Sequence, residues 1–273
     1  MRRAPRLLAG ALAAGVLLAS AGCAAPVDPI ERLGRKAAQK VRQVRPGAGP
    51  PVAAAAYRTW GLAAPLAAPP PARRAAGLPY VVDRVPTRDR VVFVTYDDGA
   101  ERDPAFARMV GELRLPISMF LTDSVAAPGY GHFDALRRSG GASVQNHTVG
   151  HRHLPGLSYA DQRAEICGQQ DRLAARFGAR PRLFRPPYGA YDATTLAAAR
   201  SCGVERVVLW RAAMQIHDLR YADGEGLRPG DIVLAHFRGP DELKGSTLPQ
   251  MTTRMLRRIQ EQGFAVARLE DYL

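Results

Sequence analysis

The stretch VVFVTYDDG, residues 91–99, decides the fold class of this chain. Its first six residues are all β-branched or aromatic, a run typical of a strand buried in a parallel sheet. Two adjacent carboxylates, Asp97 and Asp98, stand where this strand is expected to end, and Gly99 allows a tight exit. This pair indicates a functional site at the carboxyl ends of the strands.

Strand-like and helical runs alternate after residue 90. Further strands are expected at 116–122, 142–147, 182–185, 204–210, 231–237 and 264–269. Helices are expected at 103–115, 131–140, 158–178, 192–203 and 248–263. This alternation predicts a parallel α/β architecture, either a barrel or a doubly wound sheet.

Polar side chains follow one expected strand after another. They are Asp97 and Asp98, Thr122 and Asp123, His147, Arg185, Arg211 and His236. Because the carboxyl ends of parallel strands meet at one rim, we expect these side chains to converge. That convergence is stronger evidence for a site than any single motif.

The net charge of +13 is concentrated before the α/β region. Residues 1–90 carry 15 basic and 4 acidic side chains, whereas residues 91–273 carry 23 and 21. A nucleic-acid partner is therefore not expected, because the predicted folded part is almost neutral.

The first residues have the pattern of an export signal, with basic residues before the apolar run LLAGALAAGVLLASAG. The run ends in SAGC, which resembles a bacterial lipobox although Ser20 replaces the usual leucine-like residue. We expect residues 1–22 to be a signal peptide and Cys23 to be lipidated, anchoring the chain on the outer face of the bacterial membrane. Cleavage after Ala21, giving a secreted protein, is the alternative.

Residues 23–89 are rich in Ala, Pro and Arg, a composition expected to form a semi-extended, disordered tether without a core. Residues 29–45 within it have the composition of a short basic helix near anionic lipid, or of a solvated charged spacer. Cys167 and Cys202 remain as an even pair in an oxidising compartment, each on an expected helix. A disulfide between them is predicted.

The stretch NHTVGHRHL, residues 146–154, holds three of the six histidines. His147 and His151 have a spacing that places them on one face of a turn, close enough to share a cation. His153 falls outside this spacing and is expected to be a bystander, as are His132 and His217. A surface pair of histidines is the alternative unless a third ligand arrives from another strand end.

Two carboxylates near one cation, such as Asp97 and Asp98, can have different roles. One binds the cation, and the other accepts a proton from water. Helix capping and turn formation are the alternative roles for Asp97 and Asp98, but Asp103 is the better cap.

Five ordered motifs carry a family resemblance: TYDDG, HTVGH, RPPYG, a tryptophan after VVL, and GDIVLAHF. In this order they resemble the NodB-homology polysaccharide deacetylases, carbohydrate esterase family four, over about residues 90–270. The resemblance implies an irregular (β/α) barrel for residues 90–273. It also implies a metal-dependent enzyme, usually zinc-loaded, that hydrolyses N- or O-acetyl groups on polysaccharides.

The resemblance also implies roles for single residues. The implied ligands of a divalent metal are Asp98, His147 and His151. Zn²⁺ is the metal expected first, with Co²⁺, Mn²⁺ or Ni²⁺ as alternatives. Asp97 becomes the general base, held as a carboxylate by Arg185, and His236 becomes the general acid. Tyr188 is expected to donate its backbone N–H to the oxyanion, with Pro187 and Trp210 on the substrate side of the site.

The chain departs from the family pattern at three places. Tyr96 replaces the usual Phe, and Phe237 stands where an Asp often follows the catalytic histidine. The Asp-Trp pair that the family has after the tryptophan matched by Trp210 is absent, and Asp218 is the nearest substitute. In the family that Asp tunes the catalytic histidine, so the resemblance implies a different tuning of His236. Trp210 is expected in the core or groove wall, and loop 237–246 is expected to be solvent-exposed.

The leading hypothesis is a monomeric deacetylase that acts on an N-acetylated cell-surface polysaccharide, peptidoglycan or chitin-like. The alternatives are an O-acetyl esterase and a carbohydrate-binding pseudoenzyme.

Overall fold

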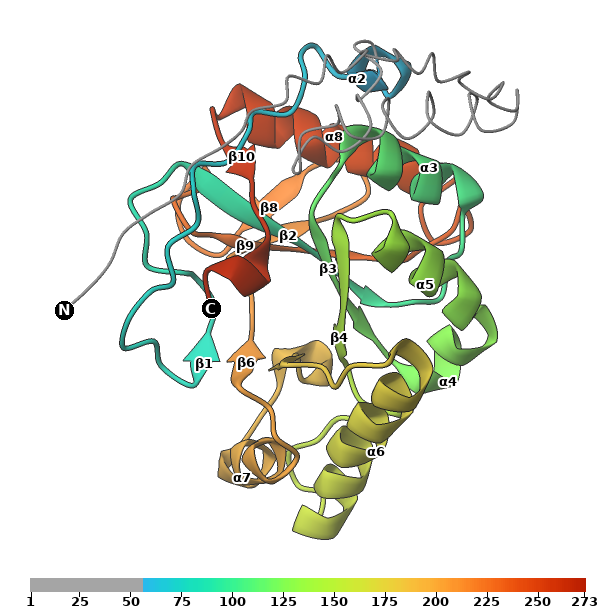
Figure 1. Ribbon diagram of the computed structural model, residues 1–273, viewed down its shortest axis with the longest axis vertical. Helices are drawn as coiled ribbons and strands as arrows, with labels where there is room; N and C mark the ends of the chain where they lie inside the picture. The colour runs from blue at the N-terminus through green and yellow to red at the C-terminus, as the bar shows by residue number, and fades with distance from the viewer. Residues whose placement is uncertain (1–55) are drawn as a thin grey trace, which may run out of the picture. The chain divides into compact units, whose positions relative to one another are not determined.

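The computed structural model describes residues 56–273, in which ten strands form one curled sheet (Figure 1). The strand order is β1-β6-β5-β4-β3-β2-β9-β7-β8, and β10 also pairs with β2. Every pairing between these strands is parallel except that of β7 with β8. The strands are β1 Val81–Val82, β2 Val91–Asp98, β3 Ile117–Leu121, β4 Ala142–Asn146, β5 Leu183–Phe184, β6 Arg206–Val208, β7 Ala212–Met214, β8 Leu219–Tyr221, β9 Ile232–His236 and β10 Ala265–Val266. The expected irregular (β/α) barrel is confirmed.

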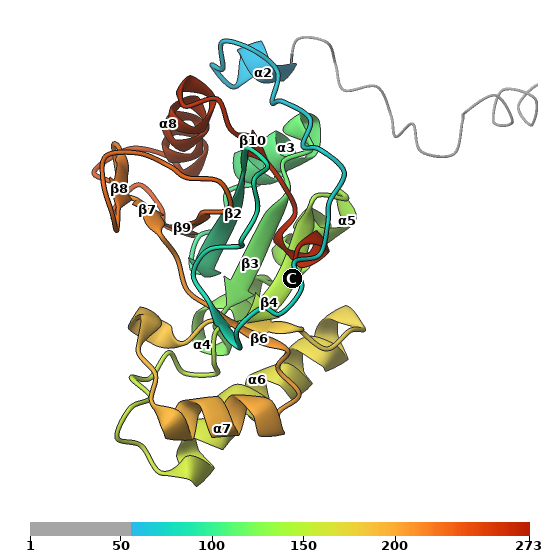
Figure 2. The same cartoon turned by 90° about the vertical axis from the view of Figure 1, so that its left-hand side faces the viewer.

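Helices cover the outside of this sheet (Figure 1). They are α2 Ala56–Thr59, α3 Pro104–Leu113, α4 Asp123–Ala126, α5 Tyr130–Arg138, α6 Tyr159–Phe177, α7 Ala193–Ser201 and α8 Leu248–Glu261, with 3-10 turns η1 Ala127–Gly129, η2 Pro187–Gly189 and η3 Leu269–Asp271. Figure 2 shows α6 and α7 side by side at one end, with α3 and α8 at the other. Within residues 56–273, no helix combines the length and apolar character that crossing a membrane requires.

Local signals set the helix boundaries. The Asp103 side chain accepts a hydrogen bond from Ala105 N, with Pro104 at the first helical position of α3. Ser158 caps α6 in the same way, and Gly178 ends it in the left-handed conformation with φ 76°. Thr247 and Gln250 form a reciprocal capping box at the start of α8.

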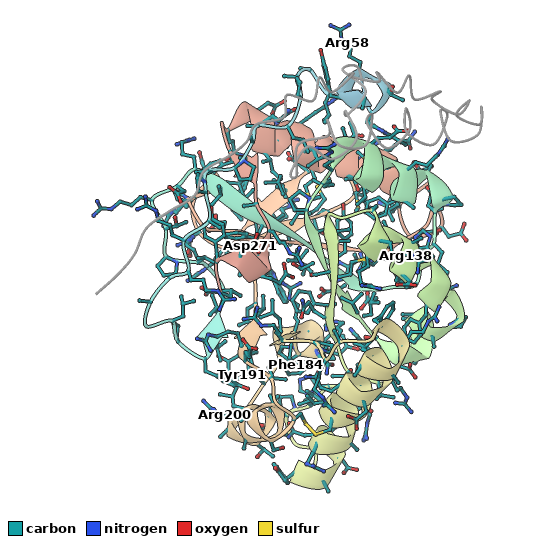
Figure 3. The ribbon with its side chains drawn as sticks, in the orientation of Figure 1. Arg58, Arg138, Phe184, Tyr191, Arg200 and Asp271 are labelled. Atoms are coloured by element: carbon teal, nitrogen blue, oxygen red, sulfur yellow. A yellow bond between two sulfur atoms is a disulfide. The ribbon has the colours of Figure 1, made fainter. Side chains whose placement is uncertain are left out.

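A cluster that includes Phe93 and Tyr272 fills the inner face of the sheet, and two more clusters lie between its outer face and the helices. One cluster packs β2, β3 and β9 against α3, α5 and α8, through side chains such as Phe106 and Met255. Another packs α6 and α7 against β5 and β6, with Phe184 fully buried in it (Figure 3). Both helical layers therefore hold the sheet from outside and leave its strand ends to form the site.

The expectation that residues up to 89 bury no core is wrong for 56–89. Leu62, Val82 and Val85 are buried, and β1 pairs in parallel with β6. The Trp60 indole donates to Glu112 of α3 at 2.8 Å, and Ala75 N donates to Tyr272 O at 3.1 Å. Alanine-rich and proline-rich chain can bury scattered apolar side chains when a neighbouring surface accepts them, so this segment wraps the barrel. The expected signal peptide and the tether up to residue 55 lie outside the described residues.

Candidate metal centre

The expected convergence of polar strand ends occurs for Asp97, Asp98, His147, Arg185 and His236. Arg211 instead forms ion pairs with Asp83 and Asp223. Asp97 at the end of β2 is in register with His236 at the end of β9. His147 follows β4, and Arg185 follows β5, with Arg185 N donating to Asn146 O at 3.0 Å. Residues separated by up to about 140 positions in the sequence therefore lie at one rim, as parallel strand ends require.

Three side chains at this rim form a candidate ligand set for a metal ion. Asp98 Oδ1 lies 3.6 Å from His147 Nε2 and 3.3 Å from His151 Nε2. One ligand atom from each of the three lies within 4.8 Å of the other two. Two imidazole nitrogens and one carboxylate oxygen are donors that suit zinc and its first-row neighbours.

A hydrogen bond fixes the tautomer of His147. Its Nδ1 lies 2.7 Å from the backbone oxygen of Arg185, which can only accept, so Nδ1 carries the proton. Nε2, the nitrogen facing Asp98, then holds the free lone pair. Burial lowers the pKa of His147 to about 4, which keeps the ring neutral as a metal ligand must be.

The residues present fit a metal ion. Asp98 Oδ1 is buried and finds no hydrogen-bond donor among residues 56–273. A buried carboxylate oxygen without a donor costs free energy, and a cation at this point would compensate it. This unpaired oxygen, its two imidazole neighbours and the fixed tautomer of His147 together fit a three-residue metal centre.

The local backbone is held in unusual conformations at the site. Of six non-glycine residues with positive φ among those described, four lie here: Asp98, Thr148, His151 and Tyr188. Thr148, at φ 72°, is β-branched, for which this region is especially unfavourable. Such strain persists only where surrounding contacts enforce it, and it concentrates at functional sites.

Asp97 is paired with Arg185 instead of lying free. Arg185 Nη1 donates to Asp97 Oδ1 at 2.7 Å, and both side chains are buried. Burial raises the pKa of Asp97, while the Arg185 guanidinium acts in the opposite direction. The expected lowering by arginine is therefore present but is outweighed, and a raised pKa is suited to a group that must accept a proton.

His236 is a partly buried ring on the same rim. Burial lowers its pKa to about 4, against the opposing effect of Asp97, so the ring is neutral at pH 7. Nowhere in the described chain does a side chain or backbone group hydrogen-bond to it. This differs from the tuned, protonated acid that the family resemblance implies.

Tyr188 and Pro187 form the turn η2 beside the ligand set. The Tyr188 side chain is 66% exposed, and its ring centroid lies 4.8 Å from that of His151. Trp210 packs so closely on Gly189 that an added Cβ there would lie 2.9 Å from the indole. The indole also lies 5.7 Å from the Arg185 guanidinium carbon, so Trp210 walls the site behind Arg185.

The structure shows how each of the three departures from the family pattern is accommodated. The hydroxyl of Tyr96 lies 2.7 Å from Thr252 Oγ1 on α8, which satisfies the buried phenol. Phe237 is fully buried among aromatic rings, 5.2 Å from Tyr96. Asp218 forms an exposed ion pair with Arg258 at 2.9 Å, and no contact joins it to His236 in the described chain. Asp218 therefore does not substitute for the missing acid.

The remaining histidines and cysteines are placed as follows. His153 is exposed with its ring 6.2 Å from that of Tyr188, outside the ligand set. His132 lies edge-on to Phe133, and His217 is exposed. Cys167 of α6 and Cys202 after α7 are joined in a disulfide. Cys23 lies outside the described residues.

The residues that support the ligand loop 147–151 are not among those expected from the sequence. Asn146, at the end of β4, accepts from Thr148 N at 2.8 Å and donates to Ile166 O at 2.9 Å. Glu165 accepts from Gly150 N at 2.7 Å. The available signal was on α6, whose inward face carries four polar residues at helical spacing: Gln162, Glu165, Gln169 and Gln170.

Comparison with known proteins agrees with this geometry. Residues 84–207 match the family model described as polysaccharide deacetylase, a span that includes the ligand set and Arg185 but ends before His236. An uncharacterized protein of Streptomyces coelicolor is 54% identical over 204 residues, covering 74% of this chain and 80% of that protein. A bifunctional xylanase/xylan deacetylase of Cellvibrio japonicus is 31% identical over 175 residues, covering 60% of this chain and 25% of that enzyme.

Solved structures share the fold at low sequence identity. The chitin deacetylase of Colletotrichum lindemuthianum superposes with a TM-score of 0.58 at 18% identity, covering 71% of this chain and 93% of that one. A family four pseudoenzyme of Bacillus anthracis gives 0.57 at 17% identity, covering 71% and 69%. The fold is therefore found with and without catalytic activity.

Proposed function

This chain belongs to the polysaccharide deacetylases of carbohydrate esterase family four, and from that premise we propose that it removes acetyl groups from an N-acetylated cell-surface polysaccharide, peptidoglycan or a chitin-like polymer. The observation that carries the proposal is the buried Asp97–Arg185 pair beside the set of Asp98, His147 and His151. It places a proton acceptor next to three ligands, the two components that hydrolysis by an activated water requires.

Asp98, His147 and His151 hold the metal in this proposal, and we propose zinc. When bound, the ion supplies a Lewis acid that polarises the acetyl carbonyl and acidifies the attacking water. Metal analysis of the purified protein tests the identity of the ion, with Co²⁺, Mn²⁺ and Ni²⁺ as the other candidates.

The protein's own residues carry the protons. Asp97 accepts one proton as water attacks the acetyl carbon, and Arg185 keeps the carboxylate oriented by its hydrogen bond at 2.7 Å. The Tyr188 N–H donates to the oxygen that becomes negative. The amine nitrogen must gain a proton as the C–N bond breaks, because an unprotonated amide nitrogen is a poor leaving group.

His236 delivers that proton. Its pKa of about 4 means that the ring is neutral before the reaction, so it must be charged during the cycle. Asp97 takes one proton from water and His236 gives one to the amine, so the protons balance, and the two residues occupy register positions on β2 and β9. One water is consumed, and acetate and a free amine are released.

Acetate release tests the function. The metal-loaded protein is assayed on N-acetylglucosamine oligomers, peptidoglycan and acetylxylan, with and without chelator. Release from the first two that is lost with chelator is the expected result. Release from acetylxylan alone would identify an O-acetyl esterase instead.

A carbohydrate-binding role without turnover is the second candidate. It is favoured by the neutral His236 ring, to which no described residue hydrogen-bonds, and by the engagement of Asp218 with Arg258. Binding of the oligomers without acetate release from any substrate would select it. Retention of Asp97, Arg185 and the full ligand set favours the enzyme.

We propose that the chain is exported and anchored through a lipid on Cys23, because SAGC follows an apolar run of signal-peptide length. The barrel would then act on polymer outside the membrane. Mass spectrometry of the mature N-terminus tests this proposal. An unmodified N-terminus at Gly22 would show that the chain is secreted without a lipid anchor.

A further inference from the structure

In the loop that carries both histidine ligands, residues 147–151, every backbone N–H donates a hydrogen bond. His147 N donates to Leu121 O at 3.1 Å, and Thr148 N donates to the Asn146 side chain at 2.8 Å. His151 N donates to Thr148 Oγ1 at 3.0 Å. The two N–H groups between them, those of Val149 and Gly150, require an acceptor from another element.

Glu165 of α6 supplies both acceptors. Its backbone oxygen lies 3.1 Å from Val149 N, and its carboxylate Oε2 lies 2.7 Å from Gly150 N. Gly150 directly precedes the ligand His151. We infer that Glu165 is a positioning residue of the metal centre, which holds His151 in place through the Gly150 amide.

The surroundings of Glu165 point to this role. The residue is 8% exposed, and its carboxylate forms no ion pair within residues 56–273. A polar side chain at a buried helix position needs a hydrogen-bond partner, whereas a residue placed there only for packing would be apolar. The hydrogen bond from Gly150 N is the interaction that a described residue makes with this carboxylate.

The fit between loop and helix is close. A Cβ added to Gly150 would lie 3.1 Å from Glu165 Oε1, tighter than ordinary contact. On the next turn of α6, a Cβ added to Gly168 would lie 3.2 Å from a methyl group of Val149. Glycine at these two positions lets the loop lie against the helix, where the short hydrogen bond to Glu165 forms.

The helix itself is fixed. Asn146 bonds to both Ile166 O and the Gln170 side chain, which ties the end of β4 to α6. The disulfide at Cys167 ties α6 to the end of α7. Glu165 therefore ties the more exposed side of the ligand set, where His151 has positive φ and a partly exposed ring, to a helix that is itself bonded to β4 and α7.

Zinc affinity tests the inference without substrate. It rests on the proposed function only in taking Asp98, His147 and His151 as ligands, and affinity is read whether or not acetate is released. Removing an outer partner of a ligand weakens metal binding by about 10- to 100-fold. Competition with a chromogenic chelator should show this loss for Glu165→Ala and an affinity near that of the wild type for Glu165→Gln, which keeps an acceptor.

Gln162→Ala is the matched control. Gln162 is a fully buried polar residue of the same helix that contacts Thr195 and Leu157 O, with no hydrogen bond to the ligand loop. Its zinc affinity should equal that of the wild type. In the metal-free protein, amide exchange at Gly150 should accelerate in Glu165→Ala and stay slow in Gln162→Ala, provided that both melt cooperatively.

Three results would overturn the inference. They are wild-type zinc affinity in Glu165→Ala, an equal loss in Gln162→Ala, and an affinity in Glu165→Gln as weak as that in Glu165→Ala.

Discussion

Arg185 Nη1 and Asp97 Oδ1 lie 2.7 Å apart at the ends of two strands, 88 positions apart in the sequence, and both side chains are buried. The same guanidinium donates to Thr95 Oγ1 and to the backbone oxygens of Val208 and Leu209. The Arg185 guanidinium thus finds its acceptors within the protein, and one of them is the Asp97 carboxylate.

Arg185→Met is expected to lower the free energy of unfolding by about 3–5 kcal/mol, because it leaves Asp97 buried without its cation. Asp97→Asn combined with Arg185→Met should lose less than the sum of the single changes, since the pair is removed together. Urea unfolding measures all three variants. Additive losses would show that the two side chains are not coupled.

Asp97→Asn is expected to lower kcat for acetate release by about 10²- to 10⁴-fold, the usual contribution of a general base. Asparagine keeps the shape of the side chain but cannot accept the proton from water. Zinc content, measured in the same samples, should stay equal to that of the wild type because Asp97 is not a proposed ligand. Near-normal turnover would remove the role of base from Asp97.

His151→Ala should abolish stoichiometric zinc binding, whereas His153→Ala should retain it. His151 Nε2 lies 3.3 Å from Asp98 Oδ1, and His153 lies outside the ligand set. Equilibrium dialysis with metal analysis gives the content of each variant. Equal zinc in the two proteins would contradict the assignment of ligands.

Replacing Cys167 and Cys202 together by alanine is expected to lower the free energy of unfolding by about 3–4 kcal/mol. The two cysteines are 35 positions apart, and the loss of a loop of this length follows from the entropy of the unfolded chain. Urea unfolding of the oxidised wild type and the double variant measures it. Because the disulfide supports α6, the double variant should also bind zinc less tightly. Equal free energies of unfolding in the wild type and the variant would refute the structural role of the disulfide.

Asp218→Asn should leave turnover unchanged and alter the free energy of unfolding by no more than about 1 kcal/mol. Its ion pair with Arg258 is exposed on both sides, where such pairs contribute little. The variant is a control for Asp97→Asn, with the same chemical change outside the site. A drop in kcat would restore Asp218 as the substitute for the missing family acid.

The local patterns predicted the elements that depend on near neighbours. The buried run at 91–96, the cap at Asp103 and the Ser158–Gly178 helix appear where expected, because side-chain alternation, capping and glycine conformation act within a few residues. The hairpin of β7 and β8 was not expected, since its strands are three residues each and carry no turn motif. The wrapping of residues 56–89 was also missed, because the surface that accepts them belongs to distant segments.

The sequence by itself determined the parallel α/β class and which polar residues stand at strand ends, because both follow from periodicity along the chain. The tertiary structure decided how those ends meet: that Asp98 faces His147 and His151, that Arg185 binds Asp97, and that Asp218 lies elsewhere. It also decided the electrostatics, since burial moves the pKa of Asp97 upward and that of His236 downward. Desolvation depends on every neighbouring segment, and the sequence specifies those neighbours only through the complete fold.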